Sequence, residues 1–406
     1  MADKGDTKRI LLTGGRSPAA LELARLLHRA GHLVFAAESS RYHLTRVSGT
    51  VERSFAVPAP ADDTASYAEA LETIVRGERI DLLIPSNEEI FHVAGGLNRL
   101  SRHCKVWTAS LETLHELHHK GRFAALAERF GLLVPRTTTI TDPSQWLALA
   151  ERSAQEWECG LVLKPVYSRF ASRVMVLSRS ETKEAWRRRL EASVSAVSER
   201  SPWAVQQYID GSHYCSYSIA YEGRVVAHAA YPSRYRVGIG ASVHFEAIAH
   251  PGIRAWVSRF AEAAGFTGQV AFDYIESRDG RLYAIECNPR ATSGIHLFGP
   301  DDGLDRAFLA PEQLAAAGTV VEPHSGSSAM LALPMVMCGL RQNRGLSDWQ
   351  AWMSAYRGSR DVVYRQSDPW PALEQLRVAW DVWRHSRRLR IPLTEATTYD
   401  IEWNGD

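Results

Sequence analysis

The chain has 406 residues, with 47 lysines and arginines against 46 aspartates and glutamates, a formal net charge of +1. The length predicts two or three domains. Hydrophobic residues make up 45% and charged residues 23%, which is a globular composition and excludes a disordered chain. The near-neutral balance gives no general attraction to nucleic acid, and no stretch is apolar enough to span a bilayer. The polar N-terminus does not fit a signal peptide. The five cysteines are scattered and lack zinc spacing, which favours buried reduced thiols, and we therefore expect a cytoplasmic protein.

The first 115 residues alternate strand-like and helix-like segments. Arg9–Thr13 and Leu33–Ala37 are expected strands that flank a helix starting near Ser17. A third strand is expected at Ile80–Pro85, after a helix around Tyr67–Arg76. This alternation predicts a parallel, doubly wound sheet.

A dinucleotide site is one alternative for this region. Gly14-Gly15 follows the first strand, and Glu38 ends the second where a ribose-binding acid would lie. The full GxGxxG pattern is absent, so the sequence argues against NAD.

The middle of the chain predicts antiparallel hairpins with short connections. In Tyr214–Tyr221 larger side chains alternate with Ser and Ala, which predicts one buried face, and Glu222-Gly223 is an expected turn. The expected strands are Leu161–Lys164, Val174–Leu177, Trp203–Tyr208, Tyr214–Tyr221 and Arg224–Tyr231.

An acidic hairpin is the most informative segment. Val270–Ile275 and Arg281–Glu286 are strand-like and are separated by Asp279-Gly280, a favoured two-residue turn. With that turn, Asp273 lies opposite Glu286. Two like charges facing each other destabilise a hairpin unless a cation lies between them.

This pairing makes a metal site the favoured interpretation, against a hairpin with solvated charges. Asn288 shares the face of Glu286, and two carboxylates with an amide oxygen suit Mg²⁺. Arg290 continues the same phase. A one-residue shift of the turn would remove the opposition.

Two lysines and one strand end are further candidates. Lys164 ends an apolar strand, where its ammonium group either reaches solvent or meets an anion. Lys120 opens a helix and by itself indicates no more than an exposed lysine. The segment Val205–Gly211 runs from a strand into a turn whose backbone is able to bind an adenine edge.

The region from about Gly326 is rich in tryptophan and arginine. Pro371–Leu389 has helical spacing, with Leu373, Leu376, Ala379, Trp380 and Trp383 on one face, and arginines gather near its end. The simplest interpretation is a packed amphipathic helix. A lid, a dimer contact or an anion site are alternatives, and a homodimer stays open.

Together these pieces resemble the ATP-grasp superfamily, in particular carbamoyl-phosphate-synthase-like enzymes and carboxylate–amine ligases. The resemblance covers roughly Arg9 to Phe298. It rests on His119–Phe123 through Pro135, Leu161–Pro165, Val205–Gly211, and Asp273 with Glu286–Arg290.

The resemblance implies three regions: residues 1–115 as a Rossmann-like pre-ATP-grasp domain, 116–325 as the ATP-grasp domain of two α+β subdomains divided near 200, and a helical C-terminal region at 326–406. It implies ATP with Mg²⁺, or Mn²⁺ in its place. Lys120 and Lys164 would hold phosphates and Arg290 would act near the transferred phosphoryl group. The hinge residues for adenine would be Gln206, Gln207, Tyr208 and Ile209, and the metal ligands Asp273, Glu286 and Asn288.

Two positions depart from the family pattern. The loop Tyr167–Arg173 after the second lysine has no glycine, so Arg169 or Arg173 is a candidate phosphate ligand. His213 stands where an acidic ribose ligand is usual, which puts the sugar contact in doubt.

The leading hypothesis is an ATP-dependent carboxylate–amine ligase that forms an amide through an acyl phosphate and releases ADP. Its partners would be a small-molecule carboxylate and an amine. A carboxylase or carbamoyl-type enzyme and a catalytically silent nucleotide-binding regulator are the alternatives. Candidate substrate residues are Arg234–Gly240, Asn87–Glu89, Ser293, Gly294, His296, Glu402 and Trp403.

Overall fold

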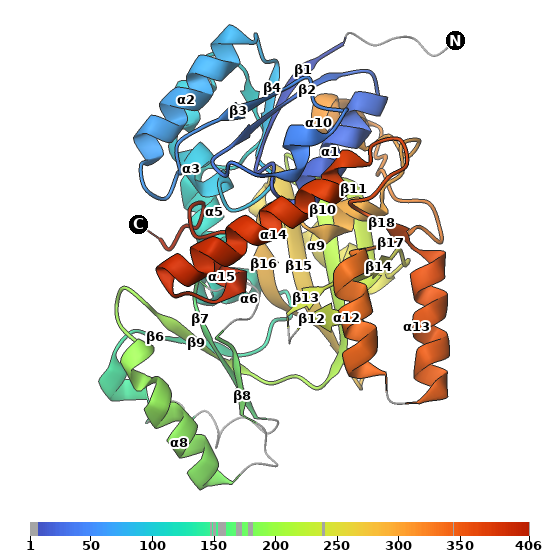
Figure 1. The fold of residues 1–406 in the computed structure, drawn as a ribbon. Coiled ribbons are helices and arrows are strands. Elements are labelled where there is room, and N and C mark those ends of the chain that lie inside the picture. The colour runs from blue at the N-terminus through green and yellow to red at the C-terminus, as the bar shows by residue number, and fades with distance from the viewer. Residues whose placement is uncertain are drawn as a thin grey trace.

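The computed structural model describes residues 7–405, apart from 147, 149–151, 153–159, 168–172, 178–181, 238–239 and 344. Its N-terminal part is a parallel five-stranded sheet in the order β3-β2-β1-β4-β5 (Figure 1). The elements are β1 (Arg9–Thr13), α1 (Pro18–Arg29), β2 (Leu33–Glu38), η1 (Leu44–Val47), β3 (Arg53–Ala56), α2 (Thr64–Gly77), β4 (Leu82–Ile84), α3 (Ile90–Gly95), α4 (Leu97–Leu100) and β5 (Lys105–Val106).

The alternation of side chains along β1 places helices on both faces of this sheet. Ile10 and Leu12 pack with residues of α1, whereas Leu11 packs with residues of α2. The predicted parallel sheet is therefore confirmed. The expected third strand is β4, because the short strand β3, half-exposed at the sheet edge, was not predicted.

A smaller subdomain follows and stands apart from the parallel sheet (Figure 1). Two helices lead into an antiparallel sheet in the order β6-β9-β7-β8, with α8 packed beside it. The elements are α5 (Leu111–His118), α6 (Lys120–Arg129), β6 (Thr137–Ile140), β7 (Leu161–Pro165), β8 (Met175–Leu177), α8 (Lys183–Ser193), η2 (Val194–Ala196) and β9 (Trp203–Gln207).

The central antiparallel sheet has the order β11-β10-β15-β16. Tyr221 pairs with Arg224, so the turn predicted at Glu222-Gly223 is confirmed. The single buried face predicted for Tyr214–Tyr221 is wrong, because Ser216 and Ser218 are as buried as Tyr217. The elements are β10 (Gly211–Tyr221), β11 (Arg224–Pro232), β12 (Arg236–Val237), β13 (Ala241–Ser242), β14 (His244–Glu246), α9 (Pro251–Ala264), β15 (Gly268–Ser277), β16 (Leu282–Asn288) and η3 (Ser293–Leu297).

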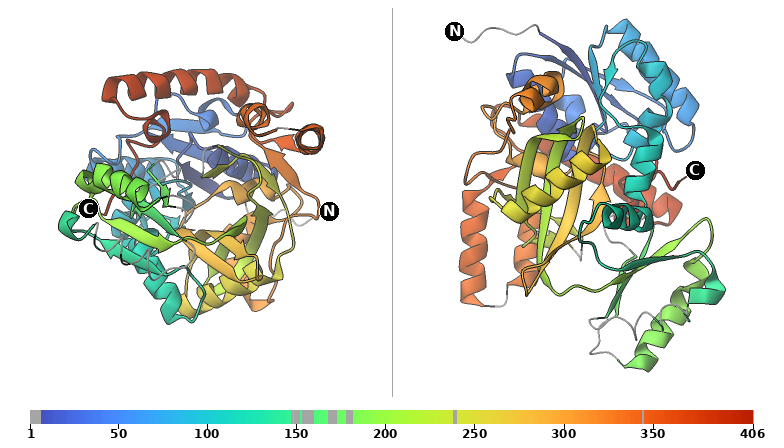
Figure 2. Two further views of the ribbon diagram at one scale, coloured as in Figure 1. Left: turned by 90° about the horizontal axis from the view of Figure 1, so that it is seen from below. Right: turned by 180° about the vertical axis from the view of Figure 1, so that it is seen from behind.

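The C-terminal helices lie along one side of the molecule, with α14 crossing next to the parallel sheet (Figures 1 and 2). Strands β17 and β18 join β14 in a three-stranded sheet. The elements are α10 (Leu304–Leu309), α11 (Pro311–Ala316), β17 (Ser328–Met330), α12 (Ala332–Gln342), α13 (Leu346–Gly358), β18 (Arg360–Asp361), α14 (Trp370–Leu389) and α15 (Leu393–Ala396).

Buried ion pairs fasten this C-terminal region to the N-terminal sheet. Glu22 of α1 lies 3.0 Å from Arg360 and also pairs with Arg365. Arg25 lies 2.9 Å from Asp368, and its guanidinium also donates to the carbonyl of Val362. Such pairs are costly to break because the remaining charge would stay buried.

Arg16, Glu38 and Asp400 form a second buried cluster of ion pairs. Because both clusters contain buried carboxylates, we expect the folded protein to lose stability in acid. Burial alone would raise the pKa of Glu22, but the hydrogen bond with His296 and the charges of Arg360 and Arg365 lower it to about 2. Burial alone would also raise the pKa of Glu38, but the charge and the hydrogen bond of Arg16 lower it to about 2.

Because both folded pKa values lie below the unfolded value, their contribution to stability is complete at neutral pH. It is lost as the pH falls from about 4.5 toward 2, at roughly 1–3 kcal/mol per carboxylate. Urea unfolding from neutral pH to about pH 3 would measure this loss. Glu22→Gln should lower stability at neutral pH and flatten the acid limb, and an unchanged limb would contradict the assignment.

Candidate active site

Asp273 and Glu286 lie directly opposite each other on β15 and β16, as predicted. The predicted turn, however, is wrong by one residue. Ser277 N donates to Arg281 O, which leaves a three-residue loop in which Gly280 has φ 79°. The opposition survives because β16 carries a compensating bulge: Tyr274 pairs with Ala284, so Ile285 is the extra residue.

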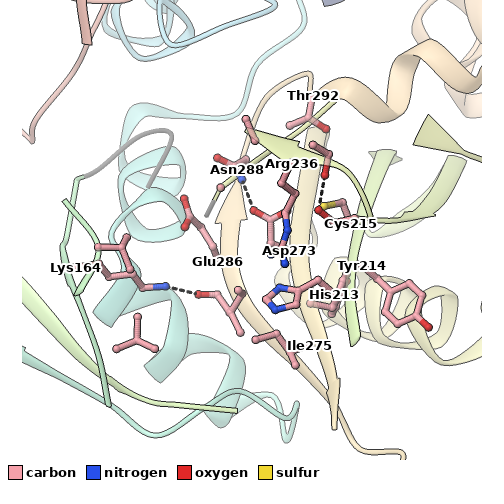
Figure 3. A pocket seen from close by; sticks show the side chains of 18 of the residues that line it. Lys164, His213, Tyr214, Cys215, Arg236, Asp273, Ile275, Glu286, Asn288 and Thr292 are labelled. Carbon is pink, nitrogen blue, oxygen red and sulfur yellow. Dashed lines mark hydrogen bonds between the residues drawn. The ribbon is translucent and has the colours of Figure 1, made fainter. Parts of the chain in front are cut away.

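The bulge also connects the two antiparallel sheets. The carbonyl oxygen of Ile285 accepts a hydrogen bond of 3.1 Å from Lys164 Nζ, which comes from the end of β7 (Figure 3). Lys164 is 4% exposed, and burial lowers its pKa to about 8 against the opposing effect of Glu286. A buried ammonium group at this place is positioned to meet an anion between the two sheets.

Lys120 also lies close to Glu286. It is the first residue of α6 and is 2% exposed, so the prediction of an exposed lysine from local sequence does not hold. Its Nζ donates to Val166 O at 3.1 Å and lies 3.6 Å from Glu286 Oε1. Both lysines are thus brought to Glu286 by different elements.

The carboxylates of Asp273 and Glu286 repel each other. Burial and the charge of Glu286 raise the pKa of Asp273 to about 6. The side-chain amide of Asn288 lies 3.5 Å from Asp273 Oδ2, so these three groups face one space (Figure 3). Carboxylate and amide oxygens are hard ligands that suit Mg²⁺.

Within the described parts of the chain, no cluster of three or more His, Cys, Asp or Glu side chains is arranged to hold a metal. A magnesium ion at Asp273 and Glu286 would therefore take further oxygen ligands from Asn288, water or a bound phosphate.

Lys164, Asp273, Glu286 and Asn288 line a cavity of about 500 Å³ between the two antiparallel sheets, whereas Lys120 is not among its lining residues. All four predicted hinge residues line this cavity: Gln206 and Gln207 end β9, and Tyr208 and Ile209 follow it. The amide N–H of Tyr208 already donates to Gly160 O, so a bound base would use other hinge groups. His213 also lines the cavity, and burial next to Arg236 lowers its pKa to about 4.

Arg290 lies at the cavity rim and contacts the N-terminal sheet. Its Nε donates to Glu88 Oε1 at 2.8 Å, and Glu88 is 1% exposed in the segment after β4. His118 Nε2 lies 3.9 Å from the other oxygen of Glu88, and both residues line the cavity. The sequence indicated Asn87–Glu89 but not His118, which only its place at the end of α5 brings here.

Arg173 does not join the cavity. Its Nε lies 3.5 Å from Glu395 of α15, and its side chain is 57% exposed. Arg169 and most of the glycine-free loop lie outside the described residues. Glu402 and Trp403 also lie away from the cavity lining; Trp403 is buried and stacks on Phe91, with ring centroids 4.9 Å apart.

A second cavity, of about 590 Å³, adjoins the first across shared residues that include Arg290, Thr292 and Ser293. Its floor is formed where the parallel strands end, because Ser17, Ser39 and Ser86 follow β1, β2 and β4. Open α/β sheets bind ligands at this edge. Helix α14 closes the other side with polar side chains, and the predicted candidate His296 also lines the space.

No protein-family model and no curated protein matches the sequence. Solved structures do match the fold. The L-amino acid ligase from Bacillus licheniformis matches with TM-score 0.55 and 15% identity, over 71% of this chain and 68% of that one. The N5-carboxyaminoimidazole synthetase from Staphylococcus aureus, complexed with ADP, matches with TM-score 0.57 and 12% identity, over 74% and 76%.

The biotin carboxylase domain of the Hydrogenobacter thermophilus 2-oxoglutarate carboxylase, in complex with MgADP, ADP and bicarbonate, gives TM-score 0.57 and 16% identity, over 79% and 72%. This chain therefore has the ATP-grasp fold, which is typical of ATP-dependent ligases. Among the described residues, no helix has the length and apolar character to cross a membrane.

Proposed function

We propose that this chain is an ATP-dependent carboxylate–amine ligase that forms an amide through an acyl phosphate and releases ADP and phosphate. One observation carries the proposal: the opposed acids Asp273 and Glu286 line a cavity together with the buried Lys164, and the buried Lys120 lies 3.6 Å from Glu286. The ADP complexes of proteins with the same fold support ATP and Mg²⁺ as co-substrates.

The proposed roles follow from position. The hinge Gln206–Ile209 would hold adenine, and His213 would lie near the sugar as a neutral side chain. Lys120 and Lys164 would neutralise phosphate oxygens that lie between the two sheets. Asp273, Glu286 and Asn288 would hold Mg²⁺, which, when bound, offsets charge on the phosphates.

The substrate carboxylate would react at the residues that the two cavities share. A substrate carboxylate near Arg290, Thr292 and Ser293 would lie at the open end of the nucleotide cavity. Its oxygen would take the γ-phosphoryl group and ADP would leave. An amine nitrogen would then attack the acyl carbon, forming the amide and releasing phosphate with loss of a proton. Positioning and charge neutralisation dominate such phosphoryl transfer.

Arg290 gains its position from another domain. Because Glu88 is buried and bonded to Arg290, the N-terminal sheet fixes the guanidinium at the junction of the cavities. Glu88 is therefore proposed as a positioning residue for Arg290.

Incubation with Mg-ATP and pools of carboxylates and amines tests the proposal. We expect ADP and phosphate in equal amounts, with a new product mass equal to acid plus amine minus water. AMP and pyrophosphate would contradict an acyl phosphate.

Adding bicarbonate to the assay distinguishes a carboxylase from an amide-forming ligase. One fold match, to a carboxylase domain in complex with bicarbonate, motivates the carboxylase alternative. A carboxylated product without amide formation would favour that alternative. A melting shift with Mg-ATP but no turnover in any pool would favour a silent nucleotide-binding regulator.

A further inference from the structure

Helix α14 turns its apolar stripe toward solvent. Leu373, Leu376 and Trp380 are 59%, 69% and 60% exposed, and Trp383 continues the stripe. Glu374 and Asp381, by contrast, face the protein and are 3% and 7% exposed. The expected packed aromatic seam is therefore wrong: the helix turns its two acids, and not its apolar stripe, toward the molecule.

Polar partners on the inner side explain this orientation. Glu374 lies 3.8 Å from Arg46 of η1, and Asp381 lies 3.6 Å from His385 on the helix itself. At about 100° per residue, the exposed stripe of Leu373, Leu376, Trp380 and Trp383 spans an arc of roughly 80° on the opposite side. Such an exposed apolar face marks a contact surface.

Helix α12 shows a second stripe of the same kind. Its apolar side chains at spacings of three and four residues are exposed: Leu333, Val336, Met337 and Leu340. Two views show α12 and α14 along the same side of the molecule (Figures 1 and 2). Helix α12 therefore also carries an exposed apolar stripe.

The charges on α14 favour an anionic partner. Both acids of the helix are turned inward, and they pair with Arg377 at 3.1 Å and with Arg384 at 3.2 Å. Three further arginines at the C-terminal end are exposed: Arg387, Arg388 and Arg390. Arg387 lies over the ring of Trp383 at 5.8 Å, and Trp380 stacks on Trp383 with centroids 4.9 Å apart. Tryptophan and leucine flanked by arginine is the composition of helices that lie in a bilayer interface.

We propose that α14 docks this protein on the surface of an anionic lipid bilayer. Trp380 and Trp383 enter the headgroup region, and the arginines contact lipid phosphates. A second copy of the chain suits the face less well, since pairing two α14 helices would bring together surfaces that carry arginine and no exposed acid. The proposal is independent of the proposed catalytic activity.

Vesicle co-sedimentation of the full chain tests the proposal. We expect binding to phosphatidylcholine vesicles that contain phosphatidylglycerol, little binding to phosphatidylcholine alone, and release at high salt. Arg387→Gln with Arg388→Gln should weaken binding about 5-fold per arginine at low salt. Trp380→Ser with Trp383→Ser should abolish the blue shift of tryptophan emission on binding.

The matched control is Arg187→Gln with Arg188→Gln on the exposed surface of α8, which should bind like the parent. Because the replaced side chains of α14 are exposed, unchanged melting temperatures would show that the variants fold. Absence of binding to either vesicle type, or equal weakening by the control, overturns the proposal. So does a dimer in light scattering that the tryptophan variant splits while vesicles bind nothing.

Discussion

Under the proposed function, replacement of Glu286 by glutamine is expected to lower the rate of ADP release about 10²–10³-fold, comparable to the loss of one preorganised electrostatic group from an active site. Glu286 faces Asp273 and lies 3.6 Å from Lys120, so its charge couples the acid pair to the lysines. Glutamine keeps the shape and removes only that charge. The measurement is the steady-state ADP release rate across a magnesium titration.

Glu276→Gln is the matched control, because Glu276 lies on the same hairpin but away from the cavity lining, 3.6 Å from His250. It should leave the rate within about twofold, as expected for a surface change. If Glu286→Gln retained the parental rate and magnesium response, the acid pair would not be part of the reaction. A loss that came with a lower melting temperature would instead indicate damage to the fold.

Phe272→Ala is expected to destabilise the protein by about 3–5 kcal/mol. Phe272 is fully buried on β15 and lies among aromatic rings of two other elements, α6 and α9. Its centroid distances are 4.8 Å to Trp256, 5.0 Å to Phe260 and 5.9 Å to Phe123. Truncation would leave a cavity in a rigid aromatic cluster that has little room to collapse. Urea unfolding would measure the loss.

The contrast with Phe272→Leu makes this result specific. Leucine fills much of the space and should cost about 1–2 kcal/mol. Since Phe272 and Asp273 point to opposite faces of β15, the leucine variant should keep the nucleotide cavity and its magnesium response. An alanine variant that lost less than about 1 kcal/mol would contradict the central role of this cluster.

The N-terminal sheet and the central hairpins were predictable because their signals are local. Apolar runs such as Ile10–Leu12 and the turn at Glu222-Gly223 follow rules of period and turn chemistry. The edge strand β3 was missed because it is short and half-exposed and carries no clear alternation.

The acidic pair shows how a correct prediction can rest on an incorrect step. The observed turn differs from the predicted one by one residue, and the bulge at Ile285 restores the predicted pairing of Asp273 with Glu286. Nothing local in Ile285 predicts a bulge. Its carbonyl accepts from Lys164, which lies more than a hundred residues earlier, so the partner that uses the bulge is visible only in the folded chain.

From the sequence alone came the main strands and helices, the ATP-grasp resemblance and the candidate ligands, because these depend on residue type, local spacing and the order of short motifs. Only the tertiary structure decided that Glu88 holds Arg290, that Lys120 is buried beside Glu286, and that Arg173 points to Glu395 instead of the cavity. It also decided that α14 presents tryptophan to solvent. Helical periodicity defines two faces, but which face packs inward depends on partners such as Arg46, which are far away in the sequence.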